Sequence, residues 1–391
     1  MKLLRYLLSF LTLIISCQNE KSDMMDGIFS YDLKVLPKTT QVRLSELGFI
    51  DIRYVPLETT DKSIINKINE IEVGSGFFII KYFNDIQKFD LSGFFINKIG
   101  IEGRGPGEFI IAHDVEIDTL KHQIYIVDGW VKKFNVYTED GVFIRTFQSP
   151  FNTINFEIID NQILCYSTNY IGNIESSYNL IDTNGRLLKA YPNKYPWQYK
   201  VQQGTAGFEE NLFYKFNNRI FKKEIYCDTV FMFEKGSFLP YIVINHGDNL
   251  LTTQARSEFN PEFLLENYIS QKKLFEFGDY LYYEFAIGLM HNKRYSLIGS
   301  KRTGLEYLIS ADQGFINDLD CGPNILPKAI EDENTVIAWV NALQLKKHVA
   351  TDEFKSSIPK YPEKKKELEK LVNSLKETDN PVLVLVSLKK K

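Results

Sequence analysis

Histidine, cysteine and tryptophan are scarce in this chain of 391 residues, which contains five His, four Cys and three Trp. The histidines form no HxH or HExxH pair and the cysteines form no CxxC pair, which are the spacings typical of zinc and redox sites. Apart from Cys17, the cysteines are Cys165, Cys227 and Cys321. Three thiols leave at least one unpaired even where a disulfide forms. We therefore predict no metal and no cofactor, and we expect buried single thiols.

A basic excess and the common catalytic motifs are also missing. The formal net charge is −4 at pH 7, which is the wrong sign for a protein that binds nucleic acid through its phosphates. No GxSxG elbow marks a nucleophilic serine. The glycine-rich run over residues 99–109 lacks the GK[ST] ending of a P-loop and the GxGxxG spacing, and Pro106 removes one amide donor. We predict no catalytic residue and no nucleic-acid partner.

Long hydrophobic segments are missing after the first sixteen residues. Lys2 and Arg5 precede an apolar run over residues 7–15, which is shorter than the roughly 20 residues needed to cross a bilayer. A positive start, a short apolar run and a small residue at the end are the parts of a secretory signal. We predict a signal peptide over residues 1–16.

The residue after this segment is Cys17, preceded by the sequence LIIS. This sequence resembles the bacterial lipobox, in which the cysteine is acylated and becomes the new N-terminus. Each buried lipid methylene contributes about 0.8 kcal/mol, so several chains make a durable anchor. The resemblance implies lipidation at Cys17 and a membrane partner through that lipid. It also implies a tether over residues 17–44 and a place at the outer membrane, on its periplasmic side or at the cell surface.

Aromatic residues are plentiful, with 29 Phe and 22 Tyr, and they recur in a repeated pattern. Three segments place an apolar residue four positions before a glycine and an apolar pair two and three positions after it. The glycines are Gly93, Gly141 and Gly185, and weaker copies of the pattern surround Gly236 and Gly304. Each copy predicts a β-hairpin whose tight turn holds the glycine at positive φ.

Further short strands lie between the hairpins, giving a unit of about 45–50 residues and four strands, the signature of a propeller blade. Counting the units predicts an all-β, six-bladed β-propeller over residues 45–391. The sixth blade begins near residues 335–340 and ends near residues 381–386. A helical insertion is predicted within it at about residues 341–378, where apolar residues recur at helical spacing. The strand over residues 50–57 has no hairpin of its own, and we expect it to complete the sixth blade and close the ring.

Three consecutive motifs resemble the repeats of NHL-type propellers. They are the glycine-rich run 99–109, the DVEID strand 114–118 and the IYIVD strand 124–128. From residue 45 onward the chain also resembles the six-bladed propeller lipoproteins of Bacteroidetes, including an NPVLVL sequence before a basic end. This resemblance implies the fold, but a shared fold carries no function by itself.

Four residues are candidate ligand contacts at one mouth of the predicted ring. Arg104 and Glu108 lie in the glycine-rich run, and His113 precedes a strand expected near the axis. Trp130 follows an Asp-Gly turn, where an exposed indole can stack on a sugar or a peptide. The plainer interpretations are loop residues, a structural histidine and a packed rim aromatic. The nearby aspartates are expected to cap loops by accepting backbone N–H bonds; they are Asp114, Asp118 and Asp128.

The sequence therefore favours a lipid-anchored binding module over an enzyme. We expect it to hold a partner protein or a small extracellular ligand at one mouth of the ring, where loops from every blade converge. One alternative is a metal-dependent lyase or hydrolase, because some NHL-type propellers are lyases with histidines around a central zinc. That alternative needs at least two histidines or carboxylates to converge within metal reach on the axis, and it fails if His113, His246 and His291 point away from the channel. A second alternative is a scaffold in an outer-membrane nutrient-uptake complex.

Overall fold

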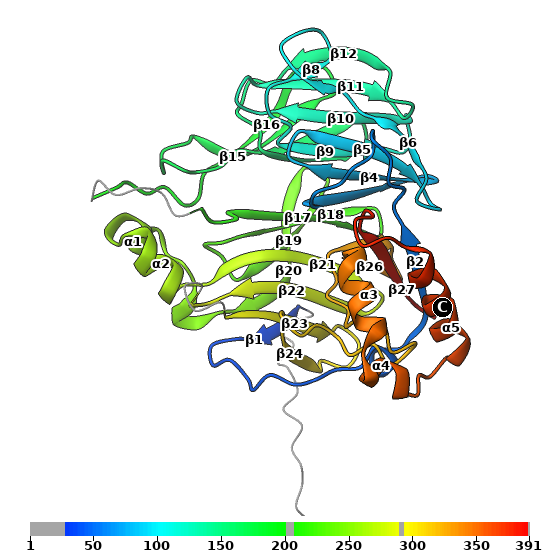
Figure 1. The fold of residues 1–391 in the computed structure, drawn as a ribbon. Helices are drawn as coiled ribbons and strands as arrows, with labels where there is room; N and C mark the ends of the chain where they lie inside the picture. The colour runs from blue at the N-terminus through cyan, green and yellow to red at the C-terminus, as the bar shows by residue number, and fades with distance from the viewer. Residues whose placement is uncertain (1–27, 201–206, 289–292, 390–391) are drawn as a thin grey trace, which may run out of the picture.

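The structure of the protein is a computed structural model that describes residues 28–200, 207–288 and 293–389. These residues form six β-sheets of four or five strands, arranged as blades around a central axis (Figure 1). The first strands of successive blades contact one another in the order β3, β9, β13, β17, β21 and β25, and β25 contacts β3 again. The predicted six-bladed propeller is therefore confirmed.

Blades 1 to 3 each contain four antiparallel strands, hydrogen-bonded in chain order from the axis outward. Blade 1 consists of β3 (Glu70–Gly74), β4 (Phe77–Tyr82), β5 (Asp85–Asp90) and β6 (Phe95–Lys98). Blade 2 consists of β9 (Asp114–Asp118), β10 (Gln123–Asp128), β11 (Lys133–Thr138) and β12 (Phe143–Gln148). Blade 3 consists of β13 (Asn155–Ile159), β14 (Gln162–Tyr166), β15 (Ser176–Asp182) and β16 (Leu187–Pro192). The glycine-rich run connects blades 1 and 2 through the short parallel strands β7 (Ile101–Glu102) and β8 (Glu108–Phe109).

Blades 4 and 6 include strands from the N-terminal part of the chain. Blade 4 consists of β17 (Asn211–Phe216), β18 (Arg219–Glu224), β19 (Thr229–Glu234), β20 (Ser237–Asn245) and the parallel strand β1 (Phe29–Asp32). Blade 5 consists of β21 (Ser270–Phe277), β22 (Tyr280–Ala286), β23 (Arg294–Ser300) and β24 (Glu306–Ser310). Blade 6 consists of β25 (Ala329–Asp332), β26 (Thr335–Val340), β27 (Val382–Leu388) and β2 (Phe49–Pro56).

The five hairpin glycines lie between the third and fourth strands of blades 1 to 5, and each has a positive φ, as predicted. Their surroundings differ. Gly185 has a φ of 89°, and a Cβ there would lie 2.0 Å from the carbonyl oxygen of Gln148. Gly236 has a φ of 71°, and a Cβ there would meet only the Tyr191 hydroxyl, at 3.9 Å. The turn favours glycine at both positions, whereas close packing demands it only at Gly185.

The ring is closed by an N-terminal strand that pairs with the C-terminal blade. β2 lies antiparallel to β27, with Ile52 opposite Val386 and Val55 opposite Leu383. Both edges of β27 are therefore paired, which removes an open edge at the seam. The predicted role of the early strand is confirmed.

The segment before β2 is more ordered than the sequence predicts. A tether is expected over residues 17–44, yet β1 within it joins blade 4. The chain then follows blade 5, where the Thr40 N–H donates to the Leu308 carbonyl at 2.8 Å, and forms the 3-10 helix η1 (Leu44–Leu47) before β2. The boundary at residue 45 is therefore wrong, because the folded ring already includes Phe29. This segment joins blades 4, 5 and 6.

The helices lie in connections between strands. One group connects blades 4 and 5 and contains η2 (Gly247–Asn249), α1 (Thr253–Glu258) and α2 (Pro261–Asn267). The other is the predicted insertion between β26 and β27 and contains α3 (Ala342–Ala350), α4 (Asp352–Ser356) and α5 (Pro362–Ser374). Among the described residues, the helices are all too short or too polar to span a bilayer.

The insertion has a small core of its own, formed by Leu345, Phe354, Leu368 and Val372. At its centre the buried Lys365 ammonium donates to the carbonyl of Phe354 at 2.5 Å and to the carbonyl of Ser357 at 2.8 Å. These bonds add to the cap at the C-terminal end of α4, where the Phe354 carbonyl also accepts the Ser357 backbone N–H at 3.2 Å.

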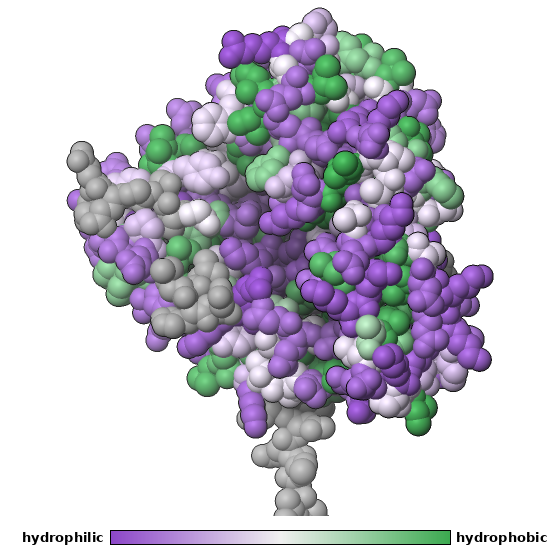
Figure 2. Space-filling model, in the orientation of Figure 1, coloured by the Kyte–Doolittle hydropathy of each residue, from purple (hydrophilic) through white to green (hydrophobic). Residues whose placement is uncertain are grey.

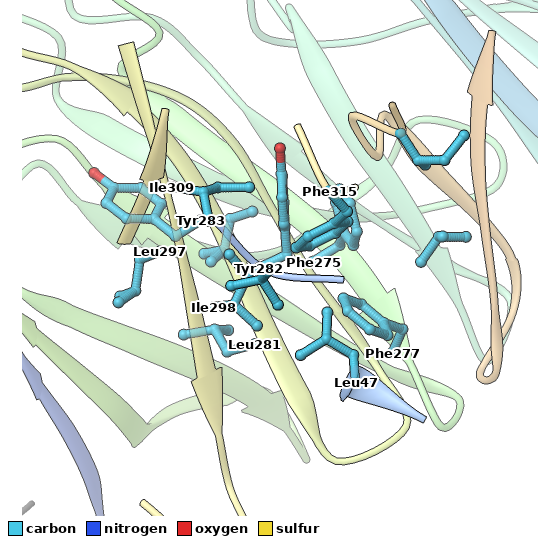
Figure 3. Packing of buried hydrophobic residues seen from close by; sticks show 14 of the residues in the cluster. Leu47, Phe275, Phe277, Leu281, Tyr282, Tyr283, Leu297, Ile298, Ile309 and Phe315 are labelled. Atoms are coloured by element: carbon cyan, nitrogen blue, oxygen red, sulfur yellow. The ribbon is translucent and has the colours of Figure 1, made fainter. Parts of the chain in front are cut away.

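The largest group of buried apolar side chains joins blades 4, 5 and 6 to the N-terminal segment. Figure 3 shows Phe275 and Phe277 of β21 beside Leu281 of β22, with Leu47 of η1 close by. Burying a side chain of this size contributes about 1.5–3 kcal/mol. The N-terminal segment is thus part of the core of the ring.

Candidate functional site

The first strands of the blades line a cavity on the central axis. Its volume is about 540 Å³, within the roughly 300–1,000 Å³ typical of small-molecule sites. The face shown in Figure 2 is hollowed near its middle, with hydrophilic residues around the hollow. Charged groups are prominent in the lining of the cavity. They are the carboxylates Glu70, Glu72, Asp114, Glu116, Glu157, Glu209 and Glu331, and the lysines Lys215, Lys272, Lys273 and Lys328.

The two signs of charge are separated around the axis. Five of the carboxylates come from blades 1 to 3, whereas the four lysines come from blades 4 and 5 and from the start of blade 6. Strand alternation produces this arrangement, because successive side chains point to opposite faces. In β3, Glu70 and Glu72 line the cavity and Ile71 between them is buried in the core. The cavity therefore has an acidic side and a basic side.

Four carboxyl groups on the acidic side have raised pKa values and bind protons more tightly than usual: Glu72, Asp114, Glu116 and Glu157. Burial, followed by the neighbouring Glu157, raises the pKa of Glu116 to about 8 against the opposing effect of Lys215. Burial and the carboxylates of Glu116 and Glu70 raise the pKa of Glu72 well above its ordinary value. The pKa of Asp114 is raised in the same way, by burial and then by Glu70. A cation entering the cavity would favour the ionised forms of these groups.

Two of the lysines already have carboxylate partners. Lys215 of β17 pairs with Glu116 of blade 2 and with Glu157 of blade 3, the latter at 2.6 Å from Nζ to Oε2. Burial alone would lower the pKa of Lys215, but these two carboxylates outweigh it and raise the pKa above its usual value. Lys328 pairs with Glu284 of β22 at 3.3 Å.

Lys272 and Lys273 differ from these two lysines. β21 has an irregular register between Gln271 and Lys273, a bulge that leaves Lys272 without a cross-strand partner. Two consecutive lysines therefore line the cavity, where regular alternation would place only one. Within residues 28–200, 207–288 and 293–389, neither ammonium forms a hydrogen bond or an ion pair. Burial, followed by repulsion from Lys328, lowers the pKa of Lys273.

The cavity can therefore hold a small molecule that carries both charges. Blade 5 lies opposite blade 2 in the order of the ring, so the unpaired lysines face carboxyl groups across the axis. A ligand carboxylate would supply the acceptor that Lys272 and Lys273 lack, and a ligand ammonium would contact the acidic side. This arrangement can bind a ligand through charge pairing alone.

Arg104 and Glu108 lie in the connection between blades 1 and 2, and neither lines the cavity. The Glu108 carboxylate accepts the Gly105 N–H at 2.7 Å, and its carbonyl accepts the Asn135 side-chain N–H at 2.9 Å. Glu108 thus shapes the glycine-rich loop, while Arg104 is exposed. Their contacts with a ligand stay predictions.

His113 and Trp130 lie together at the rim, away from the cavity. Their rings are 6.3 Å apart and inclined by 19°. His113 Nδ1 accepts the Gly129 N–H at 3.1 Å, and burial lowers the pKa of this imidazole, which favours the neutral form needed to accept. Trp130 is 72% exposed and borders a second pocket between blades 2 and 3. The structure thus brings together two of the four predicted residues.

A central histidine site has no support from the described residues. His246 is buried between blades 4 and 5, with Nδ1 2.6 Å from an Asp228 carboxylate oxygen and Nε2 3.2 Å from the Tyr283 hydroxyl. Burial, followed by the nearby Lys223, lowers its pKa to about 4. His291 lies outside the described residues. In the described part of the chain, no three His, Cys, Asp or Glu side chains gather as metal ligands. The thiols of Cys165, Cys227 and Cys321 are free there; Cys165 is buried as expected, whereas Cys227 and Cys321 are only partly buried.

The predicted loop caps are confirmed at two of the three aspartates. Asp118 accepts two N–H groups of the turn that follows it, at 3.2 and 3.0 Å. Asp128 accepts two N–H groups of the connection before β9, at 2.6 and 3.3 Å. Asp114 instead accepts the Phe156 N–H of blade 3 at 2.8 Å and lines the cavity.

The residues missed from the sequence are the charged groups of the first strands. A readable signal was present, because β3 and β9 alternate acidic and apolar residues in EIEVG and DVEID. Such alternation in the first strand of a blade places the acidic residues on the axis. No comparable pattern in the amino-acid sequence predicts the bulge in β21.

Fold and cavity together define a six-bladed propeller with a charged axial cavity. Residues 30–387 match the family described as a domain of unknown function, DUF4934, and the chain belongs to that family. No curated protein matches its sequence.

Similar folds occur among solved structures. A predicted exported protein from Bacteroides fragilis shares 19% identity and a TM-score of 0.70, over 93% of this chain and 100% of that protein. A member of the DUF4221 family from Bacteroides vulgatus shares 11% identity and a TM-score of 0.52, over 87% and 96%. At such identities the likeness shows the fold alone. Virginiamycin B lyase from Staphylococcus aureus, at 11% identity over 66% and 74% and a TM-score of 0.38, is too distant to carry an argument about activity.

Proposed function

We propose that this protein is a lipid-anchored, extracytoplasmic binding module whose cavity takes a small zwitterion, such as a free amino acid or a short peptide. The observation that carries the proposal is the pair of ammonium groups on Lys272 and Lys273, which lack a partner among the described residues and lie opposite a carboxyl-rich side. A molecule with one charge leaves one side of the cavity without a partner.

Proton release on binding distinguishes a zwitterion site from a site that binds only anions. In the empty cavity, burial and mutual repulsion raise the pKa of Glu72 and Asp114, and that of Glu116 to about 8. A ligand ammonium stabilises the ionised forms, so binding near pH 7 releases protons. A ligand that carries only a carboxylate has no such effect.

The first experiment measures the midpoint temperature of unfolding, Tm, in the presence of free amino acids and dipeptides. A ligand that binds only the folded protein raises Tm. The best ligand is then studied by calorimetry beside its N-acetylated and its amidated analogues, each of which lacks one charge. We expect the zwitterion to bind more tightly than both, and the heat to depend on the ionisation enthalpy of the buffer.

Variants locate the site. Loss of a charged hydrogen bond costs about 1.5–3 kcal/mol, so Lys273→Met should weaken binding roughly 10–100-fold. Lys370→Met is the matched control, because Lys370 is exposed on α5 and lies outside the cavity. Equal binding by Lys273→Met, or equal affinity for the acetylated analogue, would show the proposal to be wrong.

The anchor has its own test, since Cys17 lies outside the described residues. The proposal rests on the signal-like start of the chain and the lipobox resemblance, and the Bacteroides fragilis protein of similar fold is itself a predicted exported protein. Cys17→Ala should move the protein from the membrane fraction to the soluble fraction and abolish labelling by palmitate. Membrane retention of the variant would refute the anchor and leave the cavity proposal standing.

A further inference from the structure

A second pocket lies at the rim, between blades 2 and 3, and shares no lining residue with the axial cavity. Its volume is about 610 Å³. Three connections form its walls: the turn after β10 that carries Trp130, the link over residues 150–154, and the loop from Ser167 to Ser176. Neither the ring closure nor the axial cavity uses these residues.

Large apolar side chains gather here although they face solvent. Trp130 is 72% exposed, Ile171 63% and Tyr170 43%, and Phe151 also lines the pocket. Single exposed apolar residues need no explanation, whereas a group around one pocket marks a binding surface. The group includes an indole and a phenol, which combine a flat apolar face with a polar group.

The same pocket contains neutral polar groups. Ser167 is only 7% exposed and lines the pocket, and among the described residues its hydroxyl has no hydrogen-bond partner. A buried hydroxyl without a partner is unfavourable, and a ligand hydroxyl can satisfy it. Asn152, Thr168 and Ser176 add further uncharged donors and acceptors to the lining, and its two charged residues, Lys132 and Glu175, are exposed to solvent.

The turn that carries Trp130 is packed in place before any ligand arrives. Gly129 donates its N–H to His113, whose ring lies nearly parallel to the indole. A Cβ at Gly129 would lie 1.9 Å from the carbonyl oxygen of Thr153, so the turn packs directly against the link to blade 3. A platform fixed in this way loses little freedom on binding.

We propose that this pocket binds a neutral pyranose sugar, stacked on Trp130 with its hydroxyls bonded to Ser167 and the neighbouring polar groups. A pyranose has apolar C–H faces and a polar edge, which matches an aromatic platform beside neutral hydroxyl and amide groups. An apolar peptide side chain would cover the aromatic rings and leave the Ser167 hydroxyl unsatisfied. The observations therefore favour a sugar over a peptide.

The test starts with the full chain in native gels that contain soluble starch, mixed-linkage β-glucan or galactomannan. Binding slows migration, and the methyl glycoside of the sugar from the polysaccharide that slows the protein is then titrated. Because Trp130 is exposed, the sugar should reduce quenching of tryptophan fluorescence by iodide. Trp130→Ala should weaken binding at least tenfold and Ser167→Ala several-fold.

Phe94→Ala is the control, since Phe94 is 61% exposed in the blade 1 hairpin and lies outside the pocket. Its binding should equal that of the parent. The proposal is overturned if no polysaccharide slows migration or if Trp130→Ala binds as the parent does. Protection from iodide by N-acetylphenylalaninamide, with none from sugars, would overturn it in favour of a peptide site. Ser167→Ala and iodide protection of the parent keep the test decisive if Trp130→Ala does not fold.

Discussion

Arg256 of α1 is a buried cation in the connection between blades 4 and 5, and it contacts the connection between blades 3 and 4. Its side chain is 2% exposed, with Nη1 2.7 Å from a Glu210 carboxylate oxygen. It donates to the Tyr226 hydroxyl at 2.7 Å, and its guanidinium carbon lies 4.7 Å from the Trp197 ring. Glu210 also accepts the Asn169 N–H at 2.5 Å. We predict that Arg256→Met strongly destabilises the protein, because a buried Glu210 carboxylate then has no opposite charge.

The magnitude follows from the burial of both groups. Removing one partner of a buried ion pair costs about 3–5 kcal/mol. The unfolding entropy is roughly 2.1 cal/mol/K per residue, or about 0.7 kcal/mol/K for roughly 350 folded residues. The midpoint temperature of unfolding should therefore fall by about 4–7 °C. Adding Glu210→Gln removes the second charge, and the double variant should recover part of the loss, because replacing a buried pair as a whole is often close to neutral.

The assay is thermal unfolding followed by circular dichroism at several scan rates. Arg302→Met is the control, because Arg302 is 73% exposed and 4.0 Å from its carboxylate partner. An exposed pair contributes about 0–1 kcal/mol, so this variant should unfold close to the parent temperature. The reasoning fails if both arginine variants shift the temperature equally, or if the double variant loses the sum of the single losses.

Three further predictions follow from the fold. His246 is neutral in the folded protein, where its pKa is about 4, whereas a histidine in the unfolded chain takes up a proton below about pH 6.5. The neutral His246 therefore contributes roughly 3 kcal/mol to the free energy of unfolding above pH 6.5, and this contribution is lost as the pH falls to about 4. Urea unfolding should show a shallower pH dependence in His246→Asn, and equal slopes would contradict this. Gly185→Ala should lower stability by several kcal/mol and Gly236→Ala by about 1 kcal/mol, since only the first places a Cβ against a carbonyl; equal losses by urea titration would refute the packing argument. Lys365→Met should speed hydrogen exchange in α4 and α5 while leaving the blades protected, and unchanged exchange in α4 would show that the ammonium does not hold the insertion.

The blade pattern could be predicted because each hairpin is locally specified. A glycine at fixed distance from apolar residues determines the turn, and the alternation of apolar residues determines which face is buried. The helical insertion was equally readable, since Leu368 and Val372 recur at helical spacing. The seam strand followed from counting, because one strand remained without a hairpin.

β1 could not be predicted, and the reason is physical. Its four residues are too few for alternation to stand out, and it pairs in parallel with β20, with Phe29 opposite Ile242. Such pairing depends on the ring already present. The sequence shows only a polar stretch with a few apolar residues, which resembles a tether.

The axial site was hidden for a different reason. Lys272 and Lys273 are adjacent, and two neighbours in a regular strand point to opposite faces. Only the bulge in β21 places both on the cavity. On the acidic side the signal was present, but a carboxylate on a first strand has two uses: Asp118 caps a loop, whereas Glu116 lines the axis.

The charge arrangement also explains why the cavity is not filled with apolar side chains. Six first strands converge on the axis, and large apolar groups there would close it and add to the stability of the ring. Instead the raised pKa values of Glu72 and Asp114 show that burial and repulsion act against ionising these carboxyls. A cluster that resists ionisation, opposite two unpaired lysines, lowers stability unless a molecule of complementary charge occupies the space. Ligand binding should therefore raise the unfolding temperature more at pH 8 than at pH 6, because ionised carboxyl groups repel one another more when the cavity is empty.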